Sequence, residues 1–233
     1  MKIAVIGATG GTGSQVVKQA LEQGHEVIAV ARRPEAVVPA QRLIVRRGDV
    51  FDESDIVNAI AGADAVISCI GPPSGVSTNG AQGKFFNFKA GMRVMAANYT
   101  PGTIMSEGMA NILTASRRGG VKRLVMQSGI NLSEGTELSA FNRRAVRIMR
   151  RIYRKAIEDK AIAEQAVRQS NLDWVIVRAS LLRYADGTLN YTAGPAARIS
   201  LLRALPFADC ADCLVRAAVS EPGWTGKIVN VGR

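Results

Sequence analysis

The first fifteen residues place a glycine-rich turn between an apolar segment and an amphipathic one. Residues 2–6 are apolar except for Lys2, which is typical of a strand buried on both faces. Gly7, Gly10 and Gly13 follow, and an amphipathic run then begins. A glycine turn before a helix suits phosphate, because the backbone can approach it closely and the helix N-terminus offers free N–H groups. The opening therefore predicts a dinucleotide site, although its spacing is G-x-x-G-x-x-G rather than G-x-G-x-x-G. The alternative is a turn without a nucleotide.

Strand-like and helix-like segments alternate along the remaining chain. This alternation predicts an α/β fold, a doubly wound parallel (Rossmann) sheet, with the ligand in the crevice between its first and fourth strands. The expected strands are 25–31, 43–45, 64–70, 121–127, 174–178 and 228–231, and the expected helices start near Asp52 and cover 103–118, 140–169 and 208–220.

The length of 233 residues allows one large domain or two small ones. The sequence has no internal repeat, linker or low-complexity segment, so we expect one domain, 1–233. Within it we expect a long insertion at 72–102, which is either a lid or substrate wall or a packed surface excursion. We also expect a small C-terminal, substrate-side lobe over 180–233 that includes the last helix and strand.

Two arginines follow the second expected strand, at Arg32 and Arg33. A site that prefers NAD has an acidic residue near this point to hold the ribose 2′-hydroxyl. Guanidinium groups instead match a phosphate dianion in charge and geometry. The pair therefore predicts NADP(H) as the cofactor, and the alternative is two surface arginines in a loop.

The formal net charge is +11, and part of it is concentrated in the expected helix 143–155. The simplest interpretation is a solvated basic face over a packed apolar stripe. The alternative is attraction of an acidic substrate, a protein partner or an anionic surface. Nucleic-acid binding is not expected, because no aromatic-rich recognition module accompanies the charge. The arginines on one side of this helix are Arg143, Arg147, Arg150, Arg151 and Arg154.

Cysteine usage and hydropathy narrow the class of protein further. Cys210 and Cys213 have redox or metal spacing, but no second pair or histidine accompanies them, so we expect helical core positions and no metal site. The three cysteines make no disulfide framework and the N-terminus is no secretion signal, which favours a cytoplasmic protein. No apolar run reaches roughly 18 residues, so no membrane span is expected.

Several landmarks fall in one register: the glycine loop, Gly48-Asp49-Val50, the segment from Gly119 to Ser128-Gly129, and Lys160 followed by Glu164 and Arg178. Together they resemble the atypical short-chain dehydrogenase/reductases, specifically the NAD(P)H-binding group of biliverdin reductase B-like (flavin reductase-like) and NmrA-like proteins. The resemblance covers nearly the whole chain, apart from 72–102 and the details after residue 180.

The resemblance implies the positions of the cofactor-binding residues. Lys160 would orient the nicotinamide ribose, Arg32 and Arg33 would hold the 2′-phosphate, and Gly71 and Ser128 would lie on the nicotinamide side. Asp49 and Val50 would flank the adenine, and the pyrophosphate would be lined by Gly7, Thr9, Gly10, Gly11, Thr12 and Gly13.

The chain departs from this family at the proton donor. Carbonyl-reducing members have a tyrosine four residues before the lysine, and this position is Ala156. Tyr153 is about 60° away from it on an ideal helix. Tyr184 and Tyr191 are candidate substitutes that nothing in the sequence fixes. The single histidine, His25, opens the second strand and is therefore expected at the opposite end of the sheet from the cofactor.

Without a positioned acid, the favoured acceptors are those that take hydride into a conjugated ring. We therefore expect an NADPH-dependent reductase of a planar small molecule, flavin- or quinone-like, with an anionic substrate as one option. Ser128 would be the pocket hydroxyl, Lys160 the ribose anchor, and Tyr184 part of the substrate wall. Two alternatives stay open: a non-catalytic NADP(H)-binding redox sensor or regulatory protein, and a dehydrogenase or isomerase of a specialised metabolite that uses Tyr153 or Tyr184.

Overall fold

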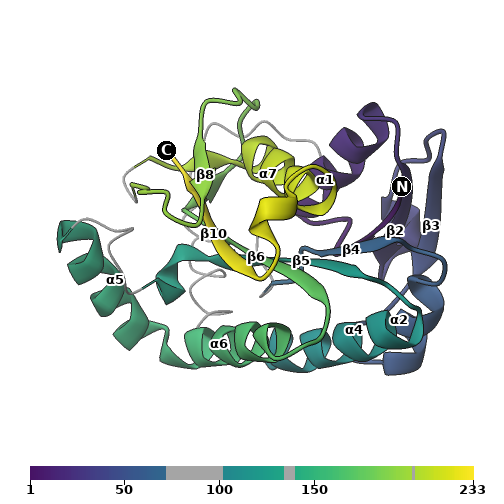
Figure 1. Ribbon diagram of the computed structural model, residues 1–233, viewed down its shortest axis with the longest axis horizontal. Coiled ribbons are helices and arrows are strands. Elements are labelled where there is room, and N and C mark those ends of the chain that lie inside the picture. The colour runs from purple at the N-terminus through teal and green to yellow at the C-terminus, as the bar shows by residue number, and fades with distance from the viewer. Residues whose placement is uncertain (72–101, 134–139, 201–202) are drawn as a thin grey trace.

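The computed structural model describes residues 1–71, 102–133, 140–200 and 203–233, and within these ranges eight strands form one sheet (Figure 1). Neighbouring strands run parallel, except for the last, which is antiparallel to its neighbour. From one edge to the other the order is β3 (Leu43–Arg47), β2 (Glu26–Ala31), β1 (Lys2–Ile6), β4 (Ala65–Ser68), β5 (Arg123–Gly129), β6 (Asp173–Ala179), β10 (Lys227–Gly232) and β8 (Thr192–Gly194).

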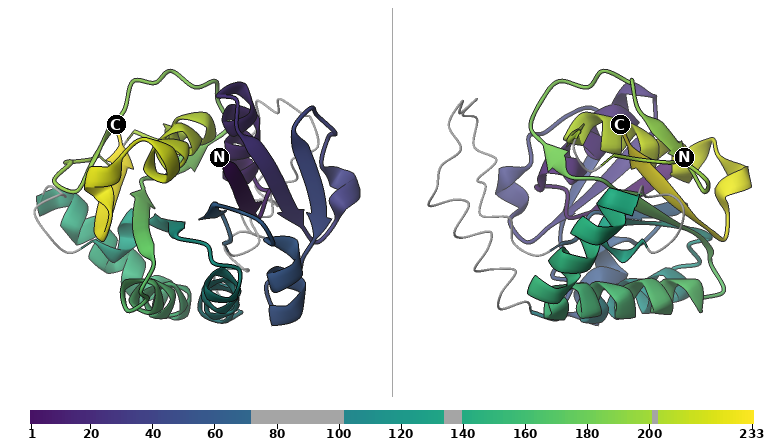
Figure 2. Two further views of the ribbon diagram at one scale, coloured as in Figure 1. Left: turned by 45° about the vertical axis from the view of Figure 1, so that its right-hand side comes forward. Right: turned by 90° about the vertical axis from the view of Figure 1, so that its left-hand side faces the viewer.

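Helices cover both faces of this sheet (Figure 2). One face carries α1 (Gly11–Glu22) and α7 (Phe207–Val219), and the other carries α2 (Glu53–Ala59), α4 (Ser106–Arg118) and α6 (Arg154–Arg168). Side chains of a strand alternate between faces. Ile3 and Val5 of β1 therefore pack toward α1 and α7, and Ala4 and Ile6 toward the other layer.

Shorter elements complete the described chain. A second sheet pairs β7 (Leu182–Arg183) with β9 (Leu205–Pro206), and α5 (Ala140–Ile152) precedes α6. Three 3-10 turns are η1 (Pro34–Ala36), η2 (Ile130–Leu132) and η3 (Pro222–Trp224).

The predicted doubly wound parallel sheet is confirmed. β1 lies between β2 and β4, so the chain reverses direction across the sheet at this point and leaves a crevice at the carboxyl ends of β1 and β4. The insertion expected at 72–102 lies, except for Gly102, outside the described residues. The sequence did not predict β7, β8 and β9, which are only two or three residues long.

The helical segment expected over 140–169 consists of two helices, because the helix is interrupted at one position. Tyr153 has φ −106° and ψ 33°, and it separates α5 from α6. The two helices pack against different neighbours: α6 lies beside α4 on the sheet, and Val146 of α5 packs against Ile130 of η2. Arg154 and Lys155 therefore open α6 and do not continue the basic face of α5.

Part of the positive charge caps helices. Arginine side chains from outside the basic segment donate to carbonyls in the last turns, or just beyond them, where the negative end of the helix dipole favours a cation. Arg42 donates to the carbonyl oxygens of Leu21 and Gly24 at the end of α1. Arg46 donates to those of Asn58, Ala59 and Ala61 at the end of α2. Arg123 donates to those of Ala217 and Glu221 at the end of α7.

Candidate functional site: a dinucleotide site at the carboxyl edge of the sheet

The turn between β1 and α1 can be built only with glycine at two positions. Gly7 has φ +82°, which side chains disfavour, and a Cβ on Gly13 would lie 2.1 Å from the carbonyl oxygen of Gly7. Gly10 is the N-cap of α1 and offers no side-chain cap. The first N–H groups of α1 have no acceptors within the helix, so the turn fits a diphosphate.

An aromatic pair lies against this turn. The ring of Phe207, at the start of α7, approaches Gly11 so closely that a Cβ there would be 2.9 Å from the ring. Tyr184 packs on Phe207 with 4.7 Å between ring centroids. Burial raises the pKa of Tyr184, which makes its phenol a weaker proton donor. The structure therefore places Tyr184 beside the glycine turn through Phe207.

Arg32 and Arg33 follow the last residue of β2, at the same edge of the sheet. Both side chains are exposed, and across the described ranges neither guanidinium forms a hydrogen bond or ion pair. The two groups are free to hold an anion beyond β2. They therefore fit the 2′-phosphate assigned to them.

The residues assigned to the adenine follow β3. Val50 is buried, and its carbonyl oxygen accepts from the Asn111 side chain at 2.8 Å. Asp49 uses one carboxylate oxygen to accept from the N–H of Phe51, which holds the turn. Gly71, beyond β4, has open space where a Cβ would lie, so no described atom closes the crevice there.

Ser128 lies inside the end of β5, where the expected strand stopped one residue earlier. It is buried, and its hydroxyl donates to Glu164 Oε1 at 2.6 Å. Arg178 of β6 holds the same carboxylate through Nη2–Oε2 at 2.6 Å and Nε–Oε1 at 3.1 Å. Because its hydrogen points to Glu164, Ser128 in this arrangement can accept a hydrogen bond from a ligand but not donate one.

Lys160 reaches the same end of β5 from α6. A Cβ on Gly129 would lie 3.0 Å from its Nζ, and Nζ donates to Asn131 Oδ1 at 3.5 Å. Burial lowers the pKa of the ammonium, while Glu164 and Asp159 oppose the shift. The structure thus brings Ser128 and Lys160 to one strand end.

Asp159 positions α6, and no sequence pattern pointed to it. The carboxylate of Asp159 accepts hydrogen bonds from the backbone N–H groups of Met105 and Ser106, both at 3.0 Å, and so caps α4 from a neighbouring helix. The roles of Glu164 and Arg178 were not predicted either, because these residues stood out only as landmarks. The spacing of Glu164 four residues after Lys160, on one face of a helix, was the available signal.

The remaining candidates lie elsewhere. Tyr191 donates to Asp212 and accepts from Arg216 on α7. Burial and the hydrogen bond to Asp212 raise the pKa of Tyr191, and Arg216 opposes the shift. Tyr153 is the N-cap of α6, so the ideal-helix angle between Tyr153 and Ala156 does not apply. His25 lies directly before β2, at the amino edge, as predicted.

The described residues include all three cysteines, which lie in or near the core, and their helices can be tested for length and polarity. Cys210 and Cys213 are buried on α7, as predicted, and burial raises the pKa of both thiols. Burial also raises the pKa of Cys69 to about 12. Every helix in the described ranges is too short or too polar to cross a bilayer.

A parallel sheet with a glycine turn at its switch point and free arginines after the second strand defines a Rossmann-fold protein that binds a nicotinamide dinucleotide. Residues 7–221 match the family model described as NAD(P)H-binding, and the chain belongs to that family. This membership confirms the resemblance noted in the sequence at the level of an NAD(P)H-binding family.

Two curated relatives match most of this chain and are longer than it. An uncharacterised chloroplast protein of Arabidopsis thaliana is 27% identical over 83% of this chain and 64% of its own length. The photosystem II assembly factor Ycf39 of Synechocystis is 24% identical over 84% of this chain and 48% of its own. The chain therefore spans less than two thirds of these relatives.

Solved structures share the fold. A short-chain dehydrogenase/reductase of Veillonella parvula in complex with NADP superposes with a TM-score of 0.73 at 16% identity, covering 100% of this chain and 94% of the other. ChuY, an anaerobilin reductase of Escherichia coli, has a TM-score of 0.72 at 18% identity, with 100% and 97% covered.

Proposed function

We propose that this chain is an NADPH-dependent reductase that transfers hydride to a planar conjugated acceptor such as a flavin or a quinone. Family membership supports the nicotinamide cofactor. The free guanidinium groups of Arg32 and Arg33 support the phosphorylated form, because they match a 2′-phosphate in charge and geometry. ChuY, which shares the fold, is named a reductase.

One observation carries the choice of acceptor. The residue one turn before Lys160 is Ala156, and the hydroxyl hydrogen of Ser128 is held by the buried carboxylate of Glu164. Neither position therefore presents a proton to a substrate. Acceptors that spread charge over a conjugated ring can accept hydride without such a donor, and carbonyl compounds benefit most from one.

The cofactor, when bound, supplies a hydride, and water supplies the proton that completes the reduction. The chain's own residues bind the cofactor and orient it. The N–H groups of the turn at Gly10 hold the diphosphate, and Lys160 donates to the ribose hydroxyls from its place beside Gly129. Orientation of this kind lowers the entropic part of the barrier.

The test is steady-state NADPH oxidation with two panels of acceptors. We expect turnover with FMN, riboflavin and naphthoquinones, and little with simple ketones and aldehydes. Tight NADPH binding without turnover on any flavin or quinone would refute the proposal. A preference for simple ketones would favour instead the dehydrogenase or isomerase, for which Tyr184→Phe and Tyr153→Phe are the diagnostic variants.

The second candidate is a non-catalytic NADP(H)-binding regulator. It is favoured by α5, which carries five arginines and no acidic residue, and by the relative Ycf39, which is named an assembly factor. In this case NADP⁺ and NADPH would bind with different affinities, and a protein partner would bind more weakly in salt and after Arg151→Ala. Equal affinities and no such partner would exclude it.

A further inference from the structure

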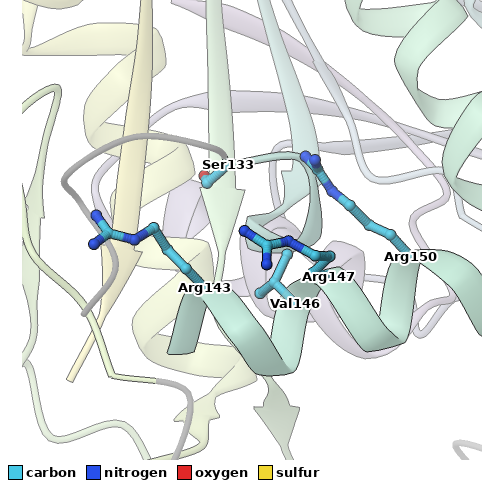
Figure 3. A pocket seen from close by; sticks show the side chains of 5 residues that line it. All are labelled: Ser133, Arg143, Val146, Arg147 and Arg150. Atoms are coloured by element: carbon cyan, nitrogen blue, oxygen red, sulfur yellow. The ribbon is translucent and has the colours of Figure 1, made fainter. Parts of the chain in front are cut away.

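A cavity of about 210 Å³ opens between α5 and the turn that follows β5 (Figure 3). Figure 3 shows three arginine side chains on the side of α5 that faces Ser133. Val146 from the same helix is buried against Ile130 of η2, which orients this side of α5. The residues lining the cavity are Ser133, Arg143, Val146, Arg147 and Arg150.

The cavity has an excess of positive charge. Arg143, Arg147 and Arg150 are spaced four and three residues apart, so their side chains are neighbours on the helix surface and their charges repel. α5 contains no acidic residue. Across the described ranges no carboxylate pairs with Arg143 or Arg147. A bound anion would relieve this repulsion.

Ser133 adds a donor to the floor of the cavity. The residue is buried, and its Oγ accepts from Arg178 Nη1 at 3.4 Å. A hydroxyl that accepts in this way keeps its hydrogen to donate, and no acceptor for it occurs in the described part of the chain. Among the described residues that line the cavity, every polar side chain therefore has a hydrogen to donate, which suits carboxylate or phosphate oxygens.

The cavity adjoins the expected nicotinamide end of the site through one residue. Arg150 Nε donates to the carbonyl oxygen of Asn131 at 2.7 Å, and Lys160 Nζ donates to the side chain of the same Asn131. Ser133 is linked through Arg178 to Glu164, the residue that holds Ser128. A ligand with one end in the cavity can therefore extend toward Ser128 and Lys160.

We infer that this cavity binds a carboxylate or phosphate group carried by the acceptor, and so selects anionic acceptors. The volume supports one group rather than a whole molecule, because pockets that enclose a drug-sized ligand measure roughly 300–1,000 Å³. That the bound anion belongs to a hydride acceptor rests on the proposed reductase activity. That the cavity binds an anion rests on the cavity alone.

FMN and riboflavin test the inference, because they share one ring system and differ by a phosphate. We expect wild type to prefer FMN in kcat/KM. In the variant Arg143→Ala/Arg147→Ala, the ratio of kcat/KM for FMN to kcat/KM for riboflavin should fall about tenfold or more. The fall should come chiefly from a higher KM for FMN, because each charge-assisted hydrogen bond contributes a factor of about ten to a hundred in affinity. Arg147→Lys keeps the charge without the fork geometry of the guanidinium, so its ratio should lie between those of wild type and the double variant.

Arg144→Ala is the matched control, because Arg144 is exposed on the same helix and does not line the cavity. It leaves the FMN-to-riboflavin ratio unchanged. An equal fall in Arg144→Ala would show that only the general charge of α5 matters, and a ratio near one in wild type would also overturn the inference.

A binding experiment separates this inference from the proposed activity. With NADP⁺ saturating the dinucleotide site, inorganic phosphate and succinate are titrated calorimetrically into wild type, Arg143→Ala/Arg147→Ala and Arg144→Ala. Binding of either anion that is lost only in the double variant supports the cavity even if no flavin is reduced, and shows which group is preferred. No binding of either anion overturns the inference, whatever the activity.

Discussion

Arg178 of β6 and Glu164 of α6 form a buried ion pair with two hydrogen bonds, at the end of the strand that carries Ser128. The side chains are 13% and 4% exposed. Ser128 gives the carboxylate a further hydrogen bond. A buried pair of this kind compensates for its desolvation only when both partners are present.

We therefore expect Arg178→Met to lower the free energy of unfolding by about 3–5 kcal/mol, because it leaves a buried carboxylate without its cation. Adding Glu164→Leu should recover much of that loss. Urea denaturation measures both variants. Arg168→Met, at an exposed position of α6, is the control and should change stability by no more than about 0.5 kcal/mol. A double variant as unstable as the sum of its single variants would contradict this account.

Asp159 should contribute more to the free energy of unfolding than its neighbour Glu158. Asp159→Ala removes the cap of α4 and should cost about 0.5–2 kcal/mol. Glu158→Ala removes only an exposed contact with Arg154, worth about 0.3–0.5 kcal/mol. The comparison uses thermal or urea unfolding of both variants, and equal losses would show that the cap contributes nothing beyond a surface charge.

Removal of the two arginines after β2 should change the choice of cofactor. We expect Arg32→Ala/Arg33→Ala to weaken NADPH binding by about tenfold or more, at about 1.5–3 kcal/mol for each charged hydrogen bond lost, and to leave NADH binding nearly unchanged. Fluorescence titration with both coenzymes measures this. The control is Arg117→Ala, on the last turn of α4. Equal weakening of NADH and NADPH would show that the arginines do not read the 2′-phosphate.

Lys160 should make stability depend on pH. Its folded-state pKa is lowered by burial from 10.5, so between the folded and unfolded pKa values the unfolded chain binds more protons. Stability contributed by this group therefore increases as pH rises through that window and is lowest below it.

The measurement is the difference in unfolding free energy between Lys160→Met and wild type. We expect the difference to favour Lys160→Met at neutral pH and to shrink as pH approaches about 10.5. Lys155→Met removes an exposed ammonium from the same helix and controls for loss of charge. A difference that grows with pH would mean that the charged form of Lys160 is stabilised by folding.

The amino-acid sequence by itself determined the elements that depend on local patterns. The apolar run before Gly7, the glycines that follow it and the alternation of strands and helices predicted the doubly wound parallel sheet, with a glycine turn between its first strand and its first helix. The sequence predicted that Asp52 or Ser54 caps a helix, and Asp52 is the N-cap of α2. These signals are local because backbone conformation, capping and periodicity involve residues within a few positions of each other.

Tertiary structure alone decided how distant residues meet. The break at Tyr153 follows from α5 and α6 packing on different surfaces, although their sequence is continuous and helical. Asp159 caps a helix that lies about fifty positions earlier in the chain, and Arg123 caps one that ends nearly a hundred positions later. The arginine-lined cavity likewise needs Ser133 and α5 to be brought together. Such contacts depend on the packing of the whole chain, because no local pattern encodes which residues fold against one another.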